Sequence, residues 1–214
     1  MTAKSLVSFV LDRSGSMALI QDDTIGGFNT YLNTLKSKAV KGLRFSLTQF
    51  DTQSVDEIYK AVKIKEVKEL TKETFVPRSG TPLIDTVCRA IKSAEQYADK
   101  DTKVVISILT DGQENSSTEF EWDDLKRLIS QQEELGWEID FMGAGIDAYA
   151  QGARMGVPDS NTMSYDKSDS RATMDSFRAR ASNTVAFAAG AAQNMAYSAD
   201  QKLKAKDKFD PARK

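Results

Sequence analysis

The stretch Ser5-Leu-Val-Ser-Phe-Val-Leu11 is mostly apolar on both of its alternating faces. A second run, Val104-Val-Ile-Ser-Ile-Leu109, is more apolar still, and a third run follows at residues 137–142. Strands that are apolar on both faces are typical of parallel sheets that helices cover on both sides. The three runs therefore predict the central strands of a parallel sheet.

Amphipathic helical patterns alternate with these runs. In each pattern the apolar residues recur three or four positions apart, which is one face of an α-helix. The positions are Ile25, Phe28, Leu32 and Leu35, then Leu83, Val87, Ile91 and Ala94, then Trp122, Leu125 and Ile129. Strands that alternate with amphipathic helices form βαβ units, so the pattern predicts a doubly wound sheet.

The segment between Gly42 and Val67 breaks the alternation, because it holds no clear helix. Residues 43–50 and 55–64 have the pattern of two strands, and the short polar connection over 51–54 is typical of a hairpin turn. One strand of this pair would be antiparallel and lie at a sheet edge. With a short edge strand at 162–165, we expect an α/β fold. It is a three-layer α/β/α sandwich around a doubly wound, mostly parallel six-stranded sheet.

The length of 214 residues suits one domain. We expect this domain to span residues 1–200 and to end in a long helix over about 169–200. A basic, flexible tail is expected over 201–214. Its charged residues are Lys202, Lys204, Lys206, Lys208, Arg213 and Lys214, partly offset by Asp207 and Asp210.

The composition excludes several classes of function. The net charge is −2, so no global field attracts the chain to nucleic acid or anionic lipid. The chain has no histidine and one cysteine, Cys88, which excludes Ser-His-Asp catalysis, His-ligated zinc and an intrachain disulfide. No apolar run is long enough to span a membrane, and the first residues do not resemble a signal peptide. We therefore expect a cytoplasmic location, or the host cytoplasm if the protein is viral.

Oxygen-bearing side chains gather where predicted strands end and where one helix begins. The first strand runs into Asp12-Arg-Ser14-Gly-Ser16, the strand at 104–109 runs into Thr-Asp111-Gly, and Thr81 precedes the helix at 83. In open α/β sheets, ligands bind at the carboxyl ends of the strands. Hard oxygen ligands suit Mg²⁺ or Mn²⁺. The candidate metal ligands are Asp12, Ser14, Ser16, Thr81 and Asp111.

This ligand set has a chemical consequence. Two carboxylates and three neutral hydroxyls leave a divalent ion short of negative charge, and an octahedral ion would keep a water or an open position. Such a site can accept a carboxylate from another molecule.

The same residues carry a resemblance to the von Willebrand factor A domain family. Asp12-x-Ser14-x-Ser16, the lone Thr81 and Asp111 in Thr-Asp-Gly follow that family's order and spacing, over roughly residues 4–190. The resemblance implies a metal-ion-dependent adhesion site. In such a site the three hydroxyls bind the metal, the two aspartates bind directly or through water, and an Asp or Glu of a partner completes the coordination.

The resemblance also implies binding of a protein rather than catalysis. We therefore expect a divalent-metal-dependent protein-binding module and no enzyme. By analogy with the family it would be a bacterial or phage adaptor, with a separately encoded ATPase or kinase as a possible partner. Membrane and nucleic-acid partners are not expected.

Two alternatives stay open. An aspartate after the first strand is also typical of aspartyl phosphatases, but those enzymes have a second acid two positions on, where this chain has Ser14. No phosphate-binding lysine motif follows. A metal-dependent hydrolase is one alternative, and a nucleic-acid-associated accessory protein that uses the basic tail is the other.

Overall fold

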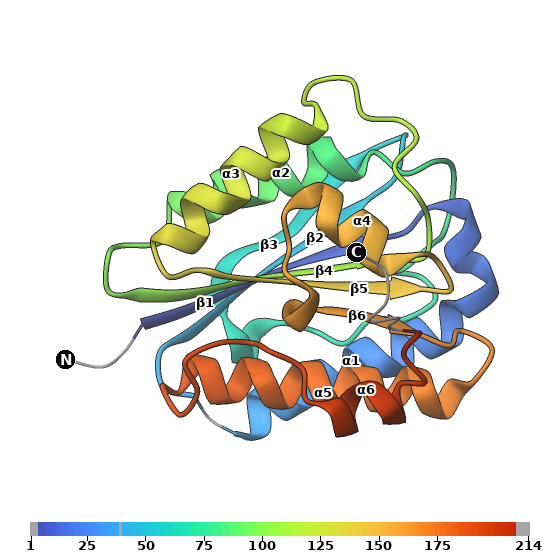
Figure 1. Cartoon of the computed structure of the whole chain (residues 1–214). Coiled ribbons are helices and arrows are strands. Elements are labelled where there is room, and N and C mark those ends of the chain that lie inside the picture. Colours follow the sequence, from blue (N-terminus) through green and yellow to red (C-terminus); the bar gives the residue numbers. More distant parts are fainter. Residues whose placement is uncertain (1–3, 39, 209–214) are drawn as a thin grey trace.

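A six-stranded sheet forms the middle layer of the molecule (Figure 1). The structure is a computed structural model that describes residues 4–38 and 40–208. The strand order is β3-β2-β1-β4-β5-β6, and within these residues only β3 is antiparallel, at one edge. The predicted fold is confirmed. The strands are β1 (Lys4–Asp12), β2 (Leu43–Phe50), β3 (Val55–Lys63), β4 (Thr102–Thr110), β5 (Glu138–Ala144) and β6 (Thr162–Tyr165).

Helices cover both faces of the sheet. The α-helices are α1 (Gln21–Ser37), α2 (Leu83–Glu95), α3 (Trp122–Glu134), α4 (Ala148–Met155), α5 (Ser170–Ala188) and α6 (Ala199–Lys204), and the 3-10 helices are η1 (Gly15–Ile20), η2 (Ile64–Glu66) and η3 (Asp159–Asn161). Figure 1 shows α2 and α3 on one face and α1 and α5 on the other. None of the helices described is both long and apolar enough to cross a membrane.

Strand β1 contributes to both hydrophobic cores, which explains why its sequence is mostly apolar. Val7, Phe9 and Leu11 point to the core under α1 and α5. Leu6 and Val10 point to the core under α2 and α3. Alternate side chains of a strand lie on opposite faces of a sheet, so a strand covered on both sides needs apolar residues at nearly every position.

A buried ion pair ties α5 to the sheet. Arg180 Nε lies 2.7 Å from Asp140 Oδ2, and both side chains are fully buried. The guanidinium also donates to the Ile108 carbonyl at 2.7 Å, while the hydroxyls of Ser107 and Tyr197 donate to the Asp140 carboxylate at 2.5 and 2.9 Å. Removing one partner from such a pair would leave an uncompensated buried charge. The network therefore fixes how α5 lies against β4 and β5.

The predicted helix over 169–200 is shorter in the structure. It ends at Ala188, and Gly190 takes a left-handed conformation with φ of 77°. A left-handed glycine just after a helix satisfies its last carbonyls and ends it. The chain then turns so that Tyr197 reaches the buried Asp140. Tertiary contact, rather than helical periodicity, decides the path of residues 189–198.

The first part of the predicted tail is also ordered into the domain. A capping box between Ser198 and Gln201 starts α6. Ala205 is fully buried, and the Asp207 carboxylate accepts hydrogen bonds from the Ser164 amide at 3.2 Å and its hydroxyl at 2.5 Å. Residues 201–208 therefore pack beside β6 instead of forming a tail. The rest of the predicted tail, 209–214, lies outside the described residues.

Because α1 packs closely against α5, alanine substitutions at the adjacent glycines Gly26 and Gly27 should have opposite effects on stability. A Cβ atom at Gly27 would lie 2.2 Å from a ring carbon of Phe177, whereas one at Gly26 would meet Met174 at 3.8 Å. We expect Gly27→Ala to lower the free energy of unfolding by about 1–3 kcal/mol through overpacking. Gly26→Ala should raise it by about 0.5–1 kcal/mol, because alanine favours a helix over glycine. Urea denaturation of both variants checks this, and equal effects would contradict the packing described.

Candidate metal centre

Two loops are joined by main-chain hydrogen bonds at the carboxyl end of β1. The Gly15 amide donates to the Ser79 carbonyl and the Arg78 amide donates to the Arg13 carbonyl, each at 2.8 Å. These bonds hold the segment that precedes α2 against the turn that follows β1. Since β4 lies beside β1, the turn after β4 reaches the same place.

The structure brings three of the predicted ligands into direct contact. The hydroxyl oxygens of Ser14 and Ser16 are 3.2 Å apart. Ser16 Oγ donates to Asp111 Oδ1 at 2.5 Å, although the two residues are 95 positions apart in sequence. Residues from the ends of β1 and β4 therefore meet as the sequence predicted.

Gly112 shows where the other two predicted ligands lie. A Cβ atom added to Gly112 would lie 3.0 Å from Thr81 Oγ1 and 3.8 Å from both Asp12 Oδ2 and Ser16 Oγ. Oxygens from the turn after β1 and from the segment before α2 thus lie around a point that the missing side chain leaves open. All five predicted ligands are accounted for in one cluster, and only Ser16 among them is exposed.

Burial raises the pKa of Asp12 to about 6, even though hydrogen bonds from Thr110 and Ser14 lower it in part. The Ser14 amide donates to Asp12 Oδ1 at 2.6 Å, and the Thr110 hydroxyl donates to Oδ2. The side chain is 0% exposed. An ionised Asp12 near neutral pH is therefore costly unless a positive charge lies against it.

The donor set fits a hard divalent cation. Neighbouring oxygens of an octahedral Mg²⁺, bound at about 2.1 Å, lie about 3 Å apart, so the 3.2 Å between Ser14 Oγ and Ser16 Oγ is compatible with two adjacent positions. The described residues hold no cluster of three or more His, Cys, Asp or Glu suited to a metal. Any ion here would be bound by two carboxylates and three hydroxyls.

Lys167 places an ammonium group at the same cluster. Its Nζ lies 3.3 Å from Asp111 Oδ2. The side chain passes over Gly145, where an added Cβ would come within 2.8 Å of the lysine Cε. Gly145 has a φ of 67°, so glycine suits this position both for its backbone and for the space it leaves. The cluster thus already attracts one positive charge from the chain itself.

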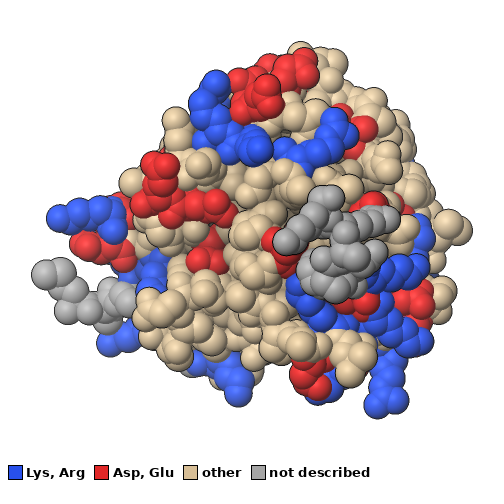
Figure 2. Space-filling model, viewed as in Figure 1, with Lys and Arg blue, Asp and Glu red and all other residues tan. Residues whose placement is uncertain are grey.

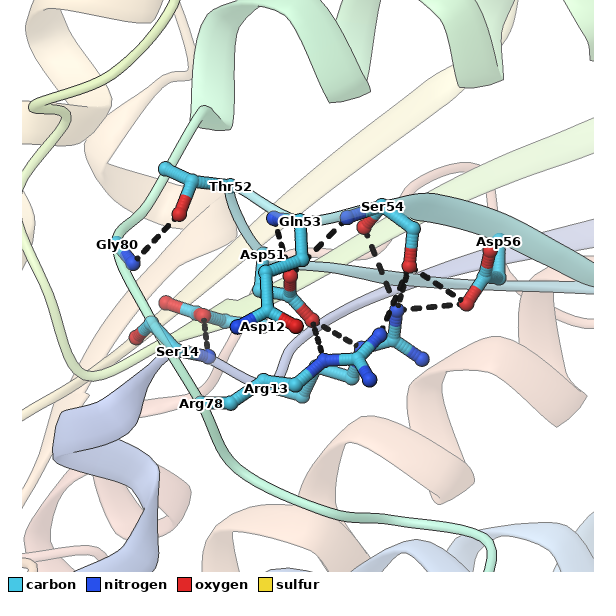
Figure 3. A network of polar contacts seen from close by, with 10 residues as sticks. All are labelled: Asp12, Arg13, Ser14, Asp51, Thr52, Gln53, Ser54, Asp56, Arg78 and Gly80. Carbon is cyan, nitrogen blue, oxygen red and sulfur yellow. Dashed lines mark hydrogen bonds and ion pairs between the residues drawn. The ribbon is translucent and has the colours of Figure 1, made fainter.

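An ion-pair network supports the turn beside the cluster (Figure 3). Asp51 Oδ2 lies 2.6 Å from Arg13 Nε and 2.8 Å from Arg78 Nε, and Arg13 also pairs with Asp56 at 2.6 Å. Burial acts to raise the pKa of Asp51, but hydrogen bonds from Arg78, Arg13 and the amides of residues 53 and 54 together lower it. Figure 3 shows Asp12 and Ser14 next to this network.

Residues after β4 fix the loop that carries Thr81. Asn115 Oδ1 accepts from the Thr81 amide at 2.9 Å, and Glu114 Oε2 accepts from the Ile84 amide at 2.8 Å. Asp85 accepts from the amides of residues 118–120. These polar side chains orient the loops and α2, and their carboxylates face main-chain amides.

Sequence reasoning missed several residues of the cluster. Arg13 and Thr110 stand next to predicted ligands, but their partners come from distant parts of the chain. The sequence did contain a signal for Lys167. This residue follows β6 by two positions, and ligands bind at the carboxyl ends of parallel strands, so it could have been placed near the cluster.

Comparison with known proteins identifies the fold. No protein-family model and no curated protein matches the chain. Among solved structures, proximal thread matrix protein 1 from the mussel byssus matches with a TM-score of 0.62 at 14% identity, over 87% of this chain and 48% of that one. The von Willebrand factor type A protein from Catenulispora acidiphila matches with a TM-score of 0.60 at 14% identity, over 86% and 43%. This chain has the von Willebrand factor A fold.

A third structural neighbour is the manganese-loaded TRAP protein of Plasmodium vivax. It matches with a TM-score of 0.55 at 14% identity, over 82% of this chain and 74% of that one. The chain spans about half the length of the first two structures. At this identity the likeness shows the von Willebrand factor A fold alone.

The pKa of Asp12 makes a prediction for the metal-free protein. Its folded pKa of about 6 exceeds the ordinary 3.8, so the unfolded state ionises first and stability falls as the pH rises from about 4 to 6. In EDTA near neutral pH, Asp12→Asn should raise the free energy of unfolding by roughly 3 kcal/mol. Below pH 4 this gain should vanish.

Chemical denaturation in EDTA at the two pH values measures the effect. Asp99 is a control of opposite sign, because a hydrogen bond from Lys4 lowers its pKa to about 2, so Asp99→Asn should not stabilise the protein. A loss of stability in Asp12→Asn at neutral pH would contradict the environment described for Asp12.

Proposed function

We propose that this protein is a divalent-metal-dependent protein-binding module. Asp12, Ser14, Ser16, Thr81 and Asp111 hold Mg²⁺ or Mn²⁺, and a carboxylate of a partner protein completes the coordination. The convergence of these five side chains from three loops carries the proposal. A bound divalent ion supplies positive charge and a position that a carboxylate oxygen can take.

The cost of burying Asp12 supports this function. A carboxylate that is 0% exposed and has a raised pKa is unfavourable in the metal-free protein, and a cation beside it would relieve that cost. The ammonium of Lys167 lies against Asp111, and no ion pair joins Asp12 to a cation among the described residues. In the neighbouring TRAP protein the structure is manganese-loaded, which adds support by analogy of fold.

The surface around the cluster suits a protein partner. Ser16 opens the cluster to solvent, and three residues on, Leu19 is 85% exposed in η1. An apolar side chain beside a charged site offers the partner contact area as well as charge. Acidic and basic side chains are interspersed on the face that Figure 2 shows, which does not favour a nucleic-acid surface there.

We propose binding without catalysis. A general base must lie within hydrogen-bond reach of the group that it activates. Two carboxylates of the adjoining loops, Asp85 and Glu114, accept instead from main-chain amides, and Asp51 is paired with Arg13 and Arg78. A hydrolase is the second candidate, and it would release phosphate from an aryl phosphate in an Asp12-dependent way. The adaptor role, an ATPase or kinase as the partner, and the cytoplasmic location stay predictions.

Thermal unfolding tests the metal site. We expect Mg²⁺ or Mn²⁺ to raise the melting temperature over EDTA, because a ligand of the folded state adds about 2.7 kcal/mol at a hundredfold excess over Kd. The double variant Ser14→Ala, Ser16→Ala should lose this response. The matched control is Ser37→Ala, Ser130→Ala, which removes two hydroxyls from exposed helix positions.

The metal site and the absence of catalysis can be disproved independently of each other. A melting temperature that no divalent ion changes, or a response that the Ser14, Ser16 variant keeps, would contradict the metal site. Phosphate release that stops with Asp12→Ala would favour the hydrolase over the binding module.

A further inference from the structure

A second candidate binding site lies near the amino ends of β1 and β2, at the other end of the strands from the metal cluster. The end of α1, the first residues of β2, the last residue of β3 and η2 enclose an open cavity of about 470 Å³. We call it the basic hollow. Val40, Leu43 and Ile64 supply its apolar side chains, and its charged residues are Lys36, Lys41, Arg44, Lys63 and Lys65.

All the charged side chains that line the basic hollow are cationic. No ion pair joins any of the five to an acidic group among the residues the structure describes. Lys36 Nζ instead donates to the Val67 carbonyl at 2.6 Å. Lysines are favourable at the end of a helix, which accounts for Lys36 on α1 but not for the cations of the strands.

Two of these cations occupy directly opposite positions on neighbouring strands. Arg44 of β2 pairs with Lys63 of β3 in the antiparallel ladder. Like charges in directly opposite positions are destabilising. This repulsion remains in the folded protein, although an acidic residue in place of either Arg44 or Lys63 would remove it.

A β-bulge holds Arg44 in place. The register of the β2–β3 ladder shifts between Phe45 and Leu47, and Ala61 on the other strand has a φ of 45°. The Ala61 amide donates to Ser46 Oγ at 2.9 Å, and Arg44 donates from Nη1 to the Ala61 carbonyl at 2.8 Å. Bulges at sheet edges redirect side chains, and strain of this kind gathers at functional sites.

We infer that the basic hollow binds an acidic peptide segment of a partner protein. Carboxylates of the segment would lie against the five cations, and an apolar side chain between them would contact Val40, Leu43 and Ile64. No aromatic side chain lines the hollow, whereas sites for single-stranded nucleic acid rely on aromatic stacking. The inference is independent of the metal cluster, which lies at the carboxyl ends of the parallel strands.

Fluorescence anisotropy tests the inference with a labelled peptide in which glutamates flank a leucine. We expect saturable binding that weakens as salt rises. The double variant Lys63→Glu, Lys65→Glu should weaken binding at least about tenfold, or about 1.4 kcal/mol. The matched control is Lys100→Glu, Lys126→Glu, with the same change of charge at exposed positions elsewhere, and it should bind like the parent.

Stability separates loss of binding from loss of folding. Lys63→Glu places a carboxylate opposite Arg44, so the melting temperature should rise while peptide binding falls. Three results would overturn the inference: equal weakening by both double variants, unchanged affinity for the same peptide with glutamines in place of glutamates, or binding of a single-stranded oligonucleotide in preference to the peptide.

Discussion

The position of β1 in the sheet is the constraint on which the rest of the structure depends. It pairs in parallel with β2 on one side and with β4 on the other, and it contributes to both cores. This arrangement brings Asp12 to the carboxyl edge, level with the end of β4. The Thr110 hydroxyl can therefore bind the Asp12 carboxylate, and Asp111 can reach Ser16. The cluster follows from strand pairing before any ligand is considered.

The buried carboxylates of the structure have two kinds of partner: some pair with arginines, and Asp12 does not. The buried pair of Arg180 and Asp140 satisfies its own charges and fixes α5. Asp51 does the same for Arg13 and Arg78 beside the cluster. Asp12 is buried with a raised pKa, as Asp140 is, but it accepts hydrogen bonds from neutral donors only. A buried carboxylate that has a raised pKa and no ion pair among the described residues is consistent with a cation that arrives from outside.

Much of the fold could be predicted because its signals are local. Strands apolar on both faces and helices with a regular apolar face gave the layers and the antiparallel edge, and the ends of β2 and β6 agree with the predicted ranges. The chain after Ala188 could not be predicted, since the contact of Tyr197 with Asp140 joins residues 57 positions apart. The position of Lys167 at Asp111 and the opposition of Arg44 to Lys63 also depend on long-range pairing. The five clustered side chains could be predicted as a set because each lies at or just after the end of a strand or just before a helix.

Anomalous diffraction from crystals soaked in Mn²⁺ tests whether a divalent ion binds among the five clustered side chains, because it locates the ion without a partner or an activity. We expect an anomalous peak within coordinating distance, about 2.0–2.3 Å, of the Ser14 and Ser16 hydroxyls, with Lys167 displaced from Asp111. A Mn²⁺ peak elsewhere on the chain, with Lys167 still paired to Asp111, would contradict the proposed metal site.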